Sequence, residues 1–214
     1  MARFITNEGK SRGLLFIFGL FLLSVALYQN IILDLPYFYA LFSLGMFLVL
    51  LSLYNTISAE TLFSDWSFVD FILFGLVLVV TCIVIDRIGM ALGYWEYPHY
   101  DEADELRKYL FEWAVALLYH KVSLLLGIEL FRRLRISDTA AFLLAMVVIV
   151  TPVGFITEAL NIQVYSWRVM DMPITNIRIG DYFLVFQTIG YWTMALIPYT
   201  VYLFFDEVIK ERRG

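Results

Sequence analysis

The sequence is dominated by apolar runs of about 20 residues, the length that a helix needs to cross the ~30 Å hydrocarbon core of a bilayer. Only helices and closed barrels satisfy their backbone hydrogen bonds inside lipid. The alternation over ~10 residues that is typical of barrel strands is absent, so the runs are predicted to be helices. Hydrophobic residues make up 61% of the chain and charged residues 16%, against about 45–50% and about 25% in soluble domains. The sequence therefore predicts an all-α, polytopic membrane bundle.

Hydropathy predicts six membrane-spanning helices. Their expected bounds are residues 13–33, 37–57, 68–88, 109–131, 139–160 and 181–205. No linker divides them, so we expect a single integral-membrane domain over residues 1–214, with two N-terminal helices in 1–67, a first hairpin in 68–135 and a second in 136–214. Pro152 lies inside the fifth run and predicts a distorted helix there, because proline has no N–H to donate and its ring collides with the preceding turn.

Three clusters of Lys and Arg set the expected orientation. They are Arg3, Lys10 and Arg12, then Arg132, Arg133 and Arg135, then Lys210, Arg212 and Arg213. Six crossings place all three clusters on one side, and the positive-inside rule makes this side cytoplasmic. We therefore expect a multi-pass protein of the cell membrane with both termini in the cytoplasm. The segments 94–108 and 161–180 would then lie outside.

An order of residue types recurs in these two external segments. Asp86 is followed nine positions later by Trp95, and Glu158 is followed nine positions later by Trp167. A proline comes after each tryptophan, and an acid then begins the next apolar run. We interpret the two hairpins as a parallel repeat related by an axis along the membrane normal, with a site where its halves meet.

Glu112 is the acid that begins the run after the first of these segments. An acid inside a membrane-spanning helix costs about 2.5–3.5 kcal/mol on insertion scales and usually faces the bundle interior. Tyr119, seven positions on, falls on the same helical face, and His120 is within reach of the same cavity. Glu112 is either a proton donor and acceptor in a low-dielectric site or a structural group. In the structural case it bonds the connecting segment or pairs with His120 or Lys121.

The other three acids each have a simpler explanation when taken alone. Asp86 ends the third run beside Arg87, where an interfacial position or a local ion pair is common. Asp181 is expected at the N-terminus of the sixth helix, where the helix dipole favours an anion. Glu158 lies near the end of the fifth run. The repeated spacing suggests a shared role instead, because four acids at one depth can line a single cavity.

Tryptophan and tyrosine side chains accompany the acids. Acids exchange protons and aromatic faces stabilise cationic intermediates, a combination that suits chemistry on a polyene or prenyl lipid. The predicted catalytic residues are Glu112, Asp181, Asp86 and Glu158. The predicted substrate-binding residues are Trp95, Tyr97, Trp167, Tyr119 and His120. No HExxH, GxSxG or P-loop motif is present, and we expect no metal or cofactor, with a metal site at His120 and Glu112 as a less favoured alternative.

At these residues the sequence resembles the lycopene cyclase domain of the small integral-membrane, heterodimer-type carotenoid cyclases. The likeness covers about residues 80–195 and is carried by Asp86, GYWEYP at 93–98, LFEW at 110–113, Trp167, Pro173 and IGDYFLVFQT at 179–188. Where the family typically has an acidic pair, this chain keeps one acid in each copy, Glu112 and Asp181. The resemblance implies a helical membrane fold and redox-neutral cyclisation or hydration of a carotenoid-like lipid. It also adds Gln187 to the substrate-binding residues.

Three functions therefore remain open. The first is an isoprenoid cyclase-like isomerase or hydratase that uses the acids above. The second is a non-catalytic lipid-binding or scaffold subunit, in which the acids pair with Arg87, Arg168 or Arg178. The third and least favoured is a proton-coupled carrier. Expected partners are a membrane lipid or isoprenoid and a homo- or hetero-oligomer in the membrane, whereas the absence of a basic patch argues against nucleic acid.

Overall fold

The structure is a computed structural model of the chain. It describes all residues except 1, 59–61, 64–65, 100, 102–107, 165, 171–176, 181 and 214, and within its helices it does not describe the side chains of residues 2–10, 111, 186, 187, 212 and 213. Two predicted site positions, Asp181 and the side chain of Gln187, therefore lie outside the described residues.

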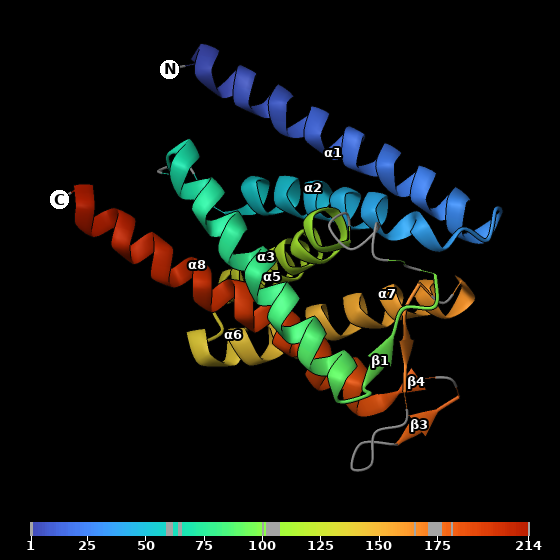
Figure 1. The fold of residues 1–214 in the computed structure, drawn as a ribbon. Coiled ribbons are helices and arrows are strands. Elements are labelled where there is room, and N and C mark those ends of the chain that lie inside the picture. The colour runs from blue at the N-terminus through green and yellow to red at the C-terminus, as the bar shows by residue number, and fades with distance from the viewer. Residues whose placement is uncertain are drawn as a thin grey trace.

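The fold is a helical bundle with short strands at one end (Figure 1). Its helices are α1 (Ala2–Ile31), α2 (Tyr39–Ile57), α3 (Phe68–Ala91), α5 (Ala114–Arg133), α6 (Asp138–Ala145), α7 (Thr151–Val164) and α8 (Tyr191–Arg213). A 3₁₀ turn at Pro36–Phe38 precedes α2, and π-helical turns precede α5, α7 and α8 at Lys108–Trp113, Met146–Val150 and Phe186–Gly190.

Five segments of the described chain are helical, long and apolar enough to cross a membrane. They are Ser11–Ile31, Pro36–Ile57, Phe68–Ala91, Lys108–Arg133 and Asp138–Val164. The prediction of a multi-pass helical protein is confirmed at this level, and the first five predicted spans match these segments closely. The sixth predicted span corresponds to α8, which is helical but is not among the five. Both ends of the chain lie on one side of the bundle and the strands on the other (Figure 1).

Proline distorts the fifth segment as predicted. The π-helical turn Met146–Val150 comes directly before Pro152, so the helix widens where the proline ring would otherwise collide with the preceding turn. Thr151 donates both its backbone N–H and its hydroxyl to the Met146 carbonyl, with the hydroxyl at 3.0 Å. The backbone bond, from a residue to the carbonyl five positions earlier, is the one that defines a π-helical turn.

Two short antiparallel strand pairs lie at the end of the bundle away from the termini (Figure 1). Strand β1 (Trp95–Glu96) pairs with β2 (Arg168–Val169), and β3 (Arg178–Ile179) pairs with β4 (Tyr182–Phe183). In the first pair Trp95 lies opposite Val169 and Glu96 opposite Arg168. This pairing joins the segment that follows α3 to the segment that follows α7.

The predicted start of the sixth helix at residue 181 is wrong. Residues 182 and 183 form strand β4, and the described helical structure begins at Leu184. Gly180 adopts a φ of 61° in the turn between β3 and β4, a conformation that glycine reaches without strain. Glycine before an acid and an apolar run is typical of a helix start, whereas here the glycine lies in the turn of a hairpin.

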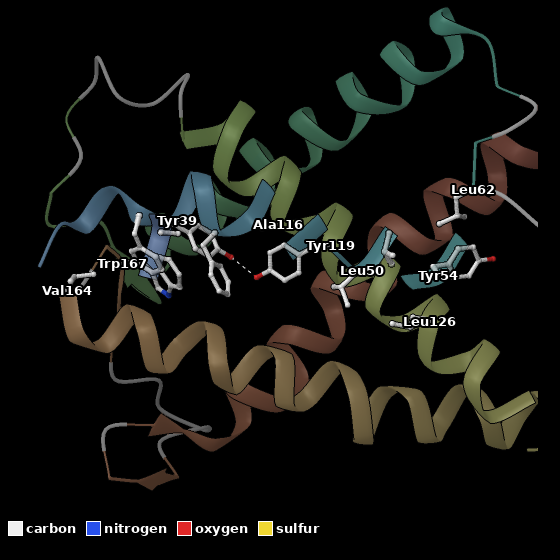
Figure 2. Packing of buried hydrophobic residues seen from close by; sticks show 13 residues of the cluster. Tyr39, Leu50, Tyr54, Leu62, Ala116, Tyr119, Leu126, Val164 and Trp167 are labelled. Carbon is white, nitrogen blue, oxygen red and sulfur yellow. Dashed lines mark hydrogen bonds between the residues drawn. The ribbon is translucent and has the colours of Figure 1, made fainter. Parts of the chain in front are cut away.

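Helix α5 is the central helix of the bundle. In its most apolar stretch 67% of the residues are buried, against 17% in α3, which lies at the outside. Its side chains form a buried cluster with those of α2 and of the segment at and after the end of α7, including Tyr39, Tyr119 and Trp167 (Figure 2). Glu112, in the π-helical turn directly before α5, is 2% exposed.

Candidate functional site: two buried carboxylates and an apolar cleft

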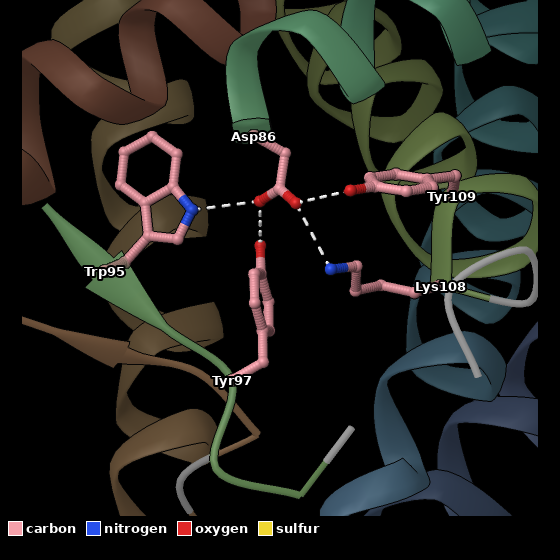
Figure 3. Close-up of polar contacts among 5 residues, drawn as sticks. All are labelled: Asp86, Trp95, Tyr97, Lys108 and Tyr109. Atoms are coloured by element: carbon pink, nitrogen blue, oxygen red, sulfur yellow. Dashed lines mark hydrogen bonds and ion pairs between the residues drawn. The ribbon is translucent and has the colours of Figure 1, made fainter. Parts of the chain in front are cut away.

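Asp86, in the last turns of α3, is completely buried and accepts four hydrogen bonds (Figure 3). Trp95 Nε1 donates to Oδ1 at 2.9 Å, and the Tyr97 hydroxyl donates to the same oxygen. The Tyr109 hydroxyl and Lys108 Nζ donate to Oδ2 at 2.7 and 3.2 Å. The Lys108 ammonium also lies 3.8 Å from the centre of the Tyr97 ring. A buried acid is therefore held by one cation and three neutral donors, from the strand segment and from the start of the next helix.

Gly89 allows the indole of Trp95 to reach back to Asp86. A Cβ atom at Gly89 would lie 2.0 Å from Cζ2 of Trp95, so the ring packs directly on the backbone of α3. Any side chain at this position would push the ring away from the helix and lengthen the bond to Asp86.

Glu158 in α7 forms a matching bond to its own tryptophan. Trp167 Nε1 donates to Oε2 at 3.1 Å, and the Tyr191 hydroxyl donates to the same oxygen at 3.1 Å. Asn161 donates to Oε1 at 3.1 Å, and its amide also bonds the backbone N–H and carbonyl of Trp167 at 3.1 and 2.8 Å. In both copies, the acid and the tryptophan nine positions later are thus joined by a direct hydrogen bond from the indole N–H to the carboxylate.

Three buried hydroxyl groups lie next to one another in the centre of the bundle. The Tyr39 and Tyr119 hydroxyls lie 3.1 Å apart (Figure 2), and the Tyr119 hydroxyl lies 3.0 Å from Thr157 Oγ1. The Thr157 hydroxyl donates to the Val153 carbonyl of its own helix at 2.9 Å. These hydroxyls therefore link α2, α5 and α7. Glu112, which is 2% exposed, lies in the π-helical turn before α5.

His120 and Lys121 follow Tyr119 in α5, and both are completely buried. The His120 ring lies 4.2 Å from the Tyr119 ring and 5.2 Å from the Tyr191 ring. Lys121 Nζ lies 3.3 Å from the centre of the Tyr202 ring. Within the described part of the chain, neither His120 nor Lys121 makes a side-chain hydrogen bond, so the alternative in which they pair with Glu112 is not formed.

An apolar cleft of about 350 Å³ lies between α3, α5 and α8. Its walls include Cys82, Ile85, Trp95, Trp113, Leu117 and Met194. Trp95 belongs both to this wall and to the Asp86 cluster, because its indole N–H points to the carboxylate. None of the described acids lines the cleft itself. Asp86 lies behind Trp95, whose ring forms part of the cleft wall.

The structure brings the predicted residues together in two groups rather than around one cavity. Asp86, Trp95 and Tyr97 form the first group, as shown in Figure 3. The second group holds Glu158 and Trp167, and Tyr39, whose ring packs on Trp167, connects it to Tyr119 and His120. Glu112 is buried in the turn before α5. At the surface, Glu96 of β1 and Arg168 of β2 form an ion pair at 3.2 Å that links the two strands. Among the described residues, no three His, Cys, Asp or Glu side chains lie close enough together to hold a metal ion.

Four residues that hydrogen-bond the carboxylates of Asp86 and Glu158 were not predicted from the sequence. They are Lys108, Tyr109, Asn161 and Tyr191. Asn161 had a usable signal, because a residue three positions after an acid lies next to it on a helix. The other three reach the acids across helix contacts that no local pattern reveals. Comparisons with protein-family models, with curated proteins and with solved structures find no match for this chain.

Proposed function

We propose that this chain is a multi-pass membrane protein that binds an extended apolar lipid of the isoprenoid type in the cleft between α3, α5 and α8. The observation that carries the proposal is the double role of Trp95, whose ring forms a cleft wall while its N–H is fixed by the buried Asp86. Aromatic faces pack well on an apolar or conjugated chain, and a fixed ring binds without losing conformational freedom.

The size of the cleft supports one end of a long lipid as the occupant. Its volume of about 350 Å³ lies at the lower end of the roughly 300–1,000 Å³ range of ligand pockets. The remainder of such a lipid would extend from the cleft into the surrounding bilayer. Since α3 is the least buried of the described spanning segments, we expect the lipid to pass between the bilayer and the cleft beside α3.

The contacts of Asp86 favour a positioning role over proton donation. To act as an acid, Asp86 would first have to hold a proton, and this would weaken four hydrogen bonds and leave the Lys108 ammonium without its counter-charge. Asp86 is therefore better suited to hold Trp95 and Tyr97 in place than to react with a lipid.

Cys82 provides a direct test, because it is the single cysteine of the chain and lines the cleft. Alkylation of Cys82 by a small apolar maleimide should be slowed when an acyclic carotenoid or geranylgeraniol is added to the protein in nanodiscs. Trp95→Ala should abolish this protection, whereas Tyr28→Ala, at an exposed position of α1 outside the cleft, should leave it intact. Equal alkylation rates with and without every isoprenoid tested would overturn the proposal.

A second candidate function is redox-neutral acid–base chemistry on the bound lipid, as in the cyclases that the sequence resembles. The observation that favours it is the burial of the two acids Glu112 and Glu158 in a bundle that also holds the neighbouring hydroxyls of Tyr39, Tyr119 and Thr157. In this reaction a proton adds to a double bond, the resulting carbocation closes a ring or takes up water, and a carboxylate receives a proton. Glu112→Gln should stop product formation from an acyclic carotenoid, whereas Glu96→Gln at the surface should not. Unchanged product with Glu112→Gln would remove the enzymatic role.

We also propose that the two hairpins, 68–135 and 136–214, are related by a two-fold axis along the membrane normal, with six crossings and cytoplasmic termini. Asp86 and Trp95 correspond to Glu158 and Trp167, each 72 positions later. Under the same shift Glu96 corresponds to Arg168, the residue that it faces in the strand pair. A residue that faces its own counterpart is what a two-fold axis produces.

Cysteine mapping tests this topology. In a Cys82→Ser background, Ser137→Cys should react with a membrane-impermeant maleimide from the side of the termini, and His99→Cys from the opposite side. Labelling of both positions from the same side would exclude the proposed arrangement.

A further inference from the structure

A second groove lies between α1 and α2. It is lined by the start of α1 and the end of α2, which lie at the end of the bundle that carries the chain termini (Figure 1). Its volume is about 400 Å³, and it is separate from the cleft described above. It is lined by Arg12, Gly13, Phe16, Ser52, Leu53 and Thr56.

The groove lies at the depth of a lipid headgroup. Arg12 is the second residue of the first candidate span, Ser11–Ile31, and Thr56 is the last but one of the second, Pro36–Ile57. Because the two helices are antiparallel neighbours, the start of one span and the end of the other meet at the same membrane boundary. The groove therefore runs from this boundary into the apolar region beside Phe16 and Leu53.

Two arginines lie at or next to the groove. Arg12 is one of its lining residues. Arg133, from the end of α5, donates through Nη2 to the carbonyl of Ile57, the residue after Thr56. Its charge is only partly offset by Glu129, whose carboxylate lies 3.8 Å from Arg133 Nε. Two cations at a headgroup-level groove favour an anionic occupant.

The floor of the groove is open and offers few hydrogen-bond donors. A Cβ atom added at Gly13 would have no neighbour within 4 Å, so this glycine leaves space that a larger residue would occupy. The hydroxyls of Ser52 and Thr56 are already donated to backbone carbonyls of Arg12 and Ser52, each at 2.8 Å. Recognition would therefore depend on charge and on apolar contact rather than on a detailed pattern of hydrogen bonds.

We propose that this groove binds one anionic phospholipid from the leaflet that faces the chain termini. Its phosphate lies at Arg12, with Arg133 as a second cation nearby, and the start of one acyl chain lies along Phe16 and Leu53. The site is separate from the isoprenoid cleft. A negative result for one of the two proposals would therefore leave the other unaffected.

Native mass spectrometry of the detergent-solubilised protein, titrated with phosphatidylglycerol or phosphatidylcholine, tests the proposal. Arg12→Gln should weaken binding of the first phosphatidylglycerol about five-fold, which corresponds to about 1 kcal/mol for one cation near an anionic surface. Gly13→Leu, which fills the groove and keeps every charge, should weaken it at least as much. Phosphatidylcholine binding should be unchanged in both variants.

Arg135→Gln is the matched control, because Arg135 is an exposed cation at the same end of the bundle that does not line the groove. It should retain the affinity of the unmodified protein. If Arg135→Gln weakened phosphatidylglycerol binding as much as Arg12→Gln, general surface charge would explain the effect and the proposal would be overturned. Unchanged phosphatidylglycerol binding in Gly13→Leu would equally overturn it, since that variant tests the space and not the charge.

Discussion

Replacement of Asp86 by asparagine tests whether the buried carboxylate organises the cleft wall. The substitution keeps the size of the side chain and removes its charge and one acceptor. If the new amide nitrogen takes the place of Oδ2, it faces the Tyr109 hydroxyl and Lys108 Nζ, and if it takes the place of Oδ1, it faces Trp95 Nε1 and the Tyr97 hydroxyl. In either orientation two donors lose their acceptor, and the Lys108 ammonium remains buried without its counter-charge.

The expected cost follows from these contacts. Removing one partner of a buried ion pair costs about 3–5 kcal/mol, and each buried donor left unsatisfied costs about 1–3 kcal/mol. Lys108 is counted in both figures, so they do not add in full. We expect Asp86→Asn to lower the free energy of unfolding by about 3–5 kcal/mol. In a protein of this size, each kcal/mol lowers Tm by about 2–4 °C.

Equilibrium unfolding in mixed micelles, followed by tryptophan fluorescence, measures this change. The double variant Asp86→Asn with Lys108→Met should be less destabilised than the sum of the two single variants, because it removes the stranded ammonium together with the acid. Glu96→Gln is the control, since its ion pair with Arg168 is about half exposed and such pairs contribute about 0–1 kcal/mol. If Asp86→Asn changes stability no more than Glu96→Gln, or if the losses at Asp86 and Lys108 simply add, the reasoning about this cluster is wrong.

Three further substitutions test other contacts by the same unfolding measurement. Gly89→Ala should displace the Trp95 ring, seen as a shift in its fluorescence and a loss of stability of about 1–3 kcal/mol, because the added methyl group overlaps that ring. Tyr191→Phe removes one hydrogen bond to Glu158 and should cost about 1.5–3 kcal/mol, as for other bonds to a charged group. Ser67→Ala removes the capping bond at the start of α3 and should cost only about 0.5–2 kcal/mol.

Local sequence patterns predicted the parts of this fold that depend on local interactions. The length of the apolar runs located the five described spanning segments, because any helix that spans a bilayer must be long enough to cross its apolar core. Pro152 predicted the distortion that appears as a π-helical turn. The acid-to-tryptophan spacing pointed to two pairs that prove to be hydrogen-bonded, Asp86 with Trp95 and Glu158 with Trp167. In these pairs the chain turns back on its own helix, so both partners belong to one short segment.

The parts that were missed depend on how helices rotate about one another. Lys108 reaches Asp86 from the start of the next helical segment, and Tyr191 reaches Glu158 from α8. The shared face of Glu112 and Tyr119 was visible in the sequence, but the partner of Tyr119 on α2, Tyr39, was not. The cleft was also not predictable, since its walls come from three helices and its empty space results from their incomplete contact.

The position of the cleft follows from where polar groups tie α3 to the rest of the bundle. Lipid is as apolar as the side chains that face it, so helices in a membrane are held mainly by close packing and by hydrogen bonds between them. The described polar links of α3 lie near its two ends. At one end Asp86 binds the strand segment and the start of the next helix, and at the other Trp66, just before α3, donates to Asp206 of α8 at 3.4 Å. Cys82 and Ile85 line the cleft between these anchors. The lipid proposed above would therefore insert between α3 and α8 without breaking either link.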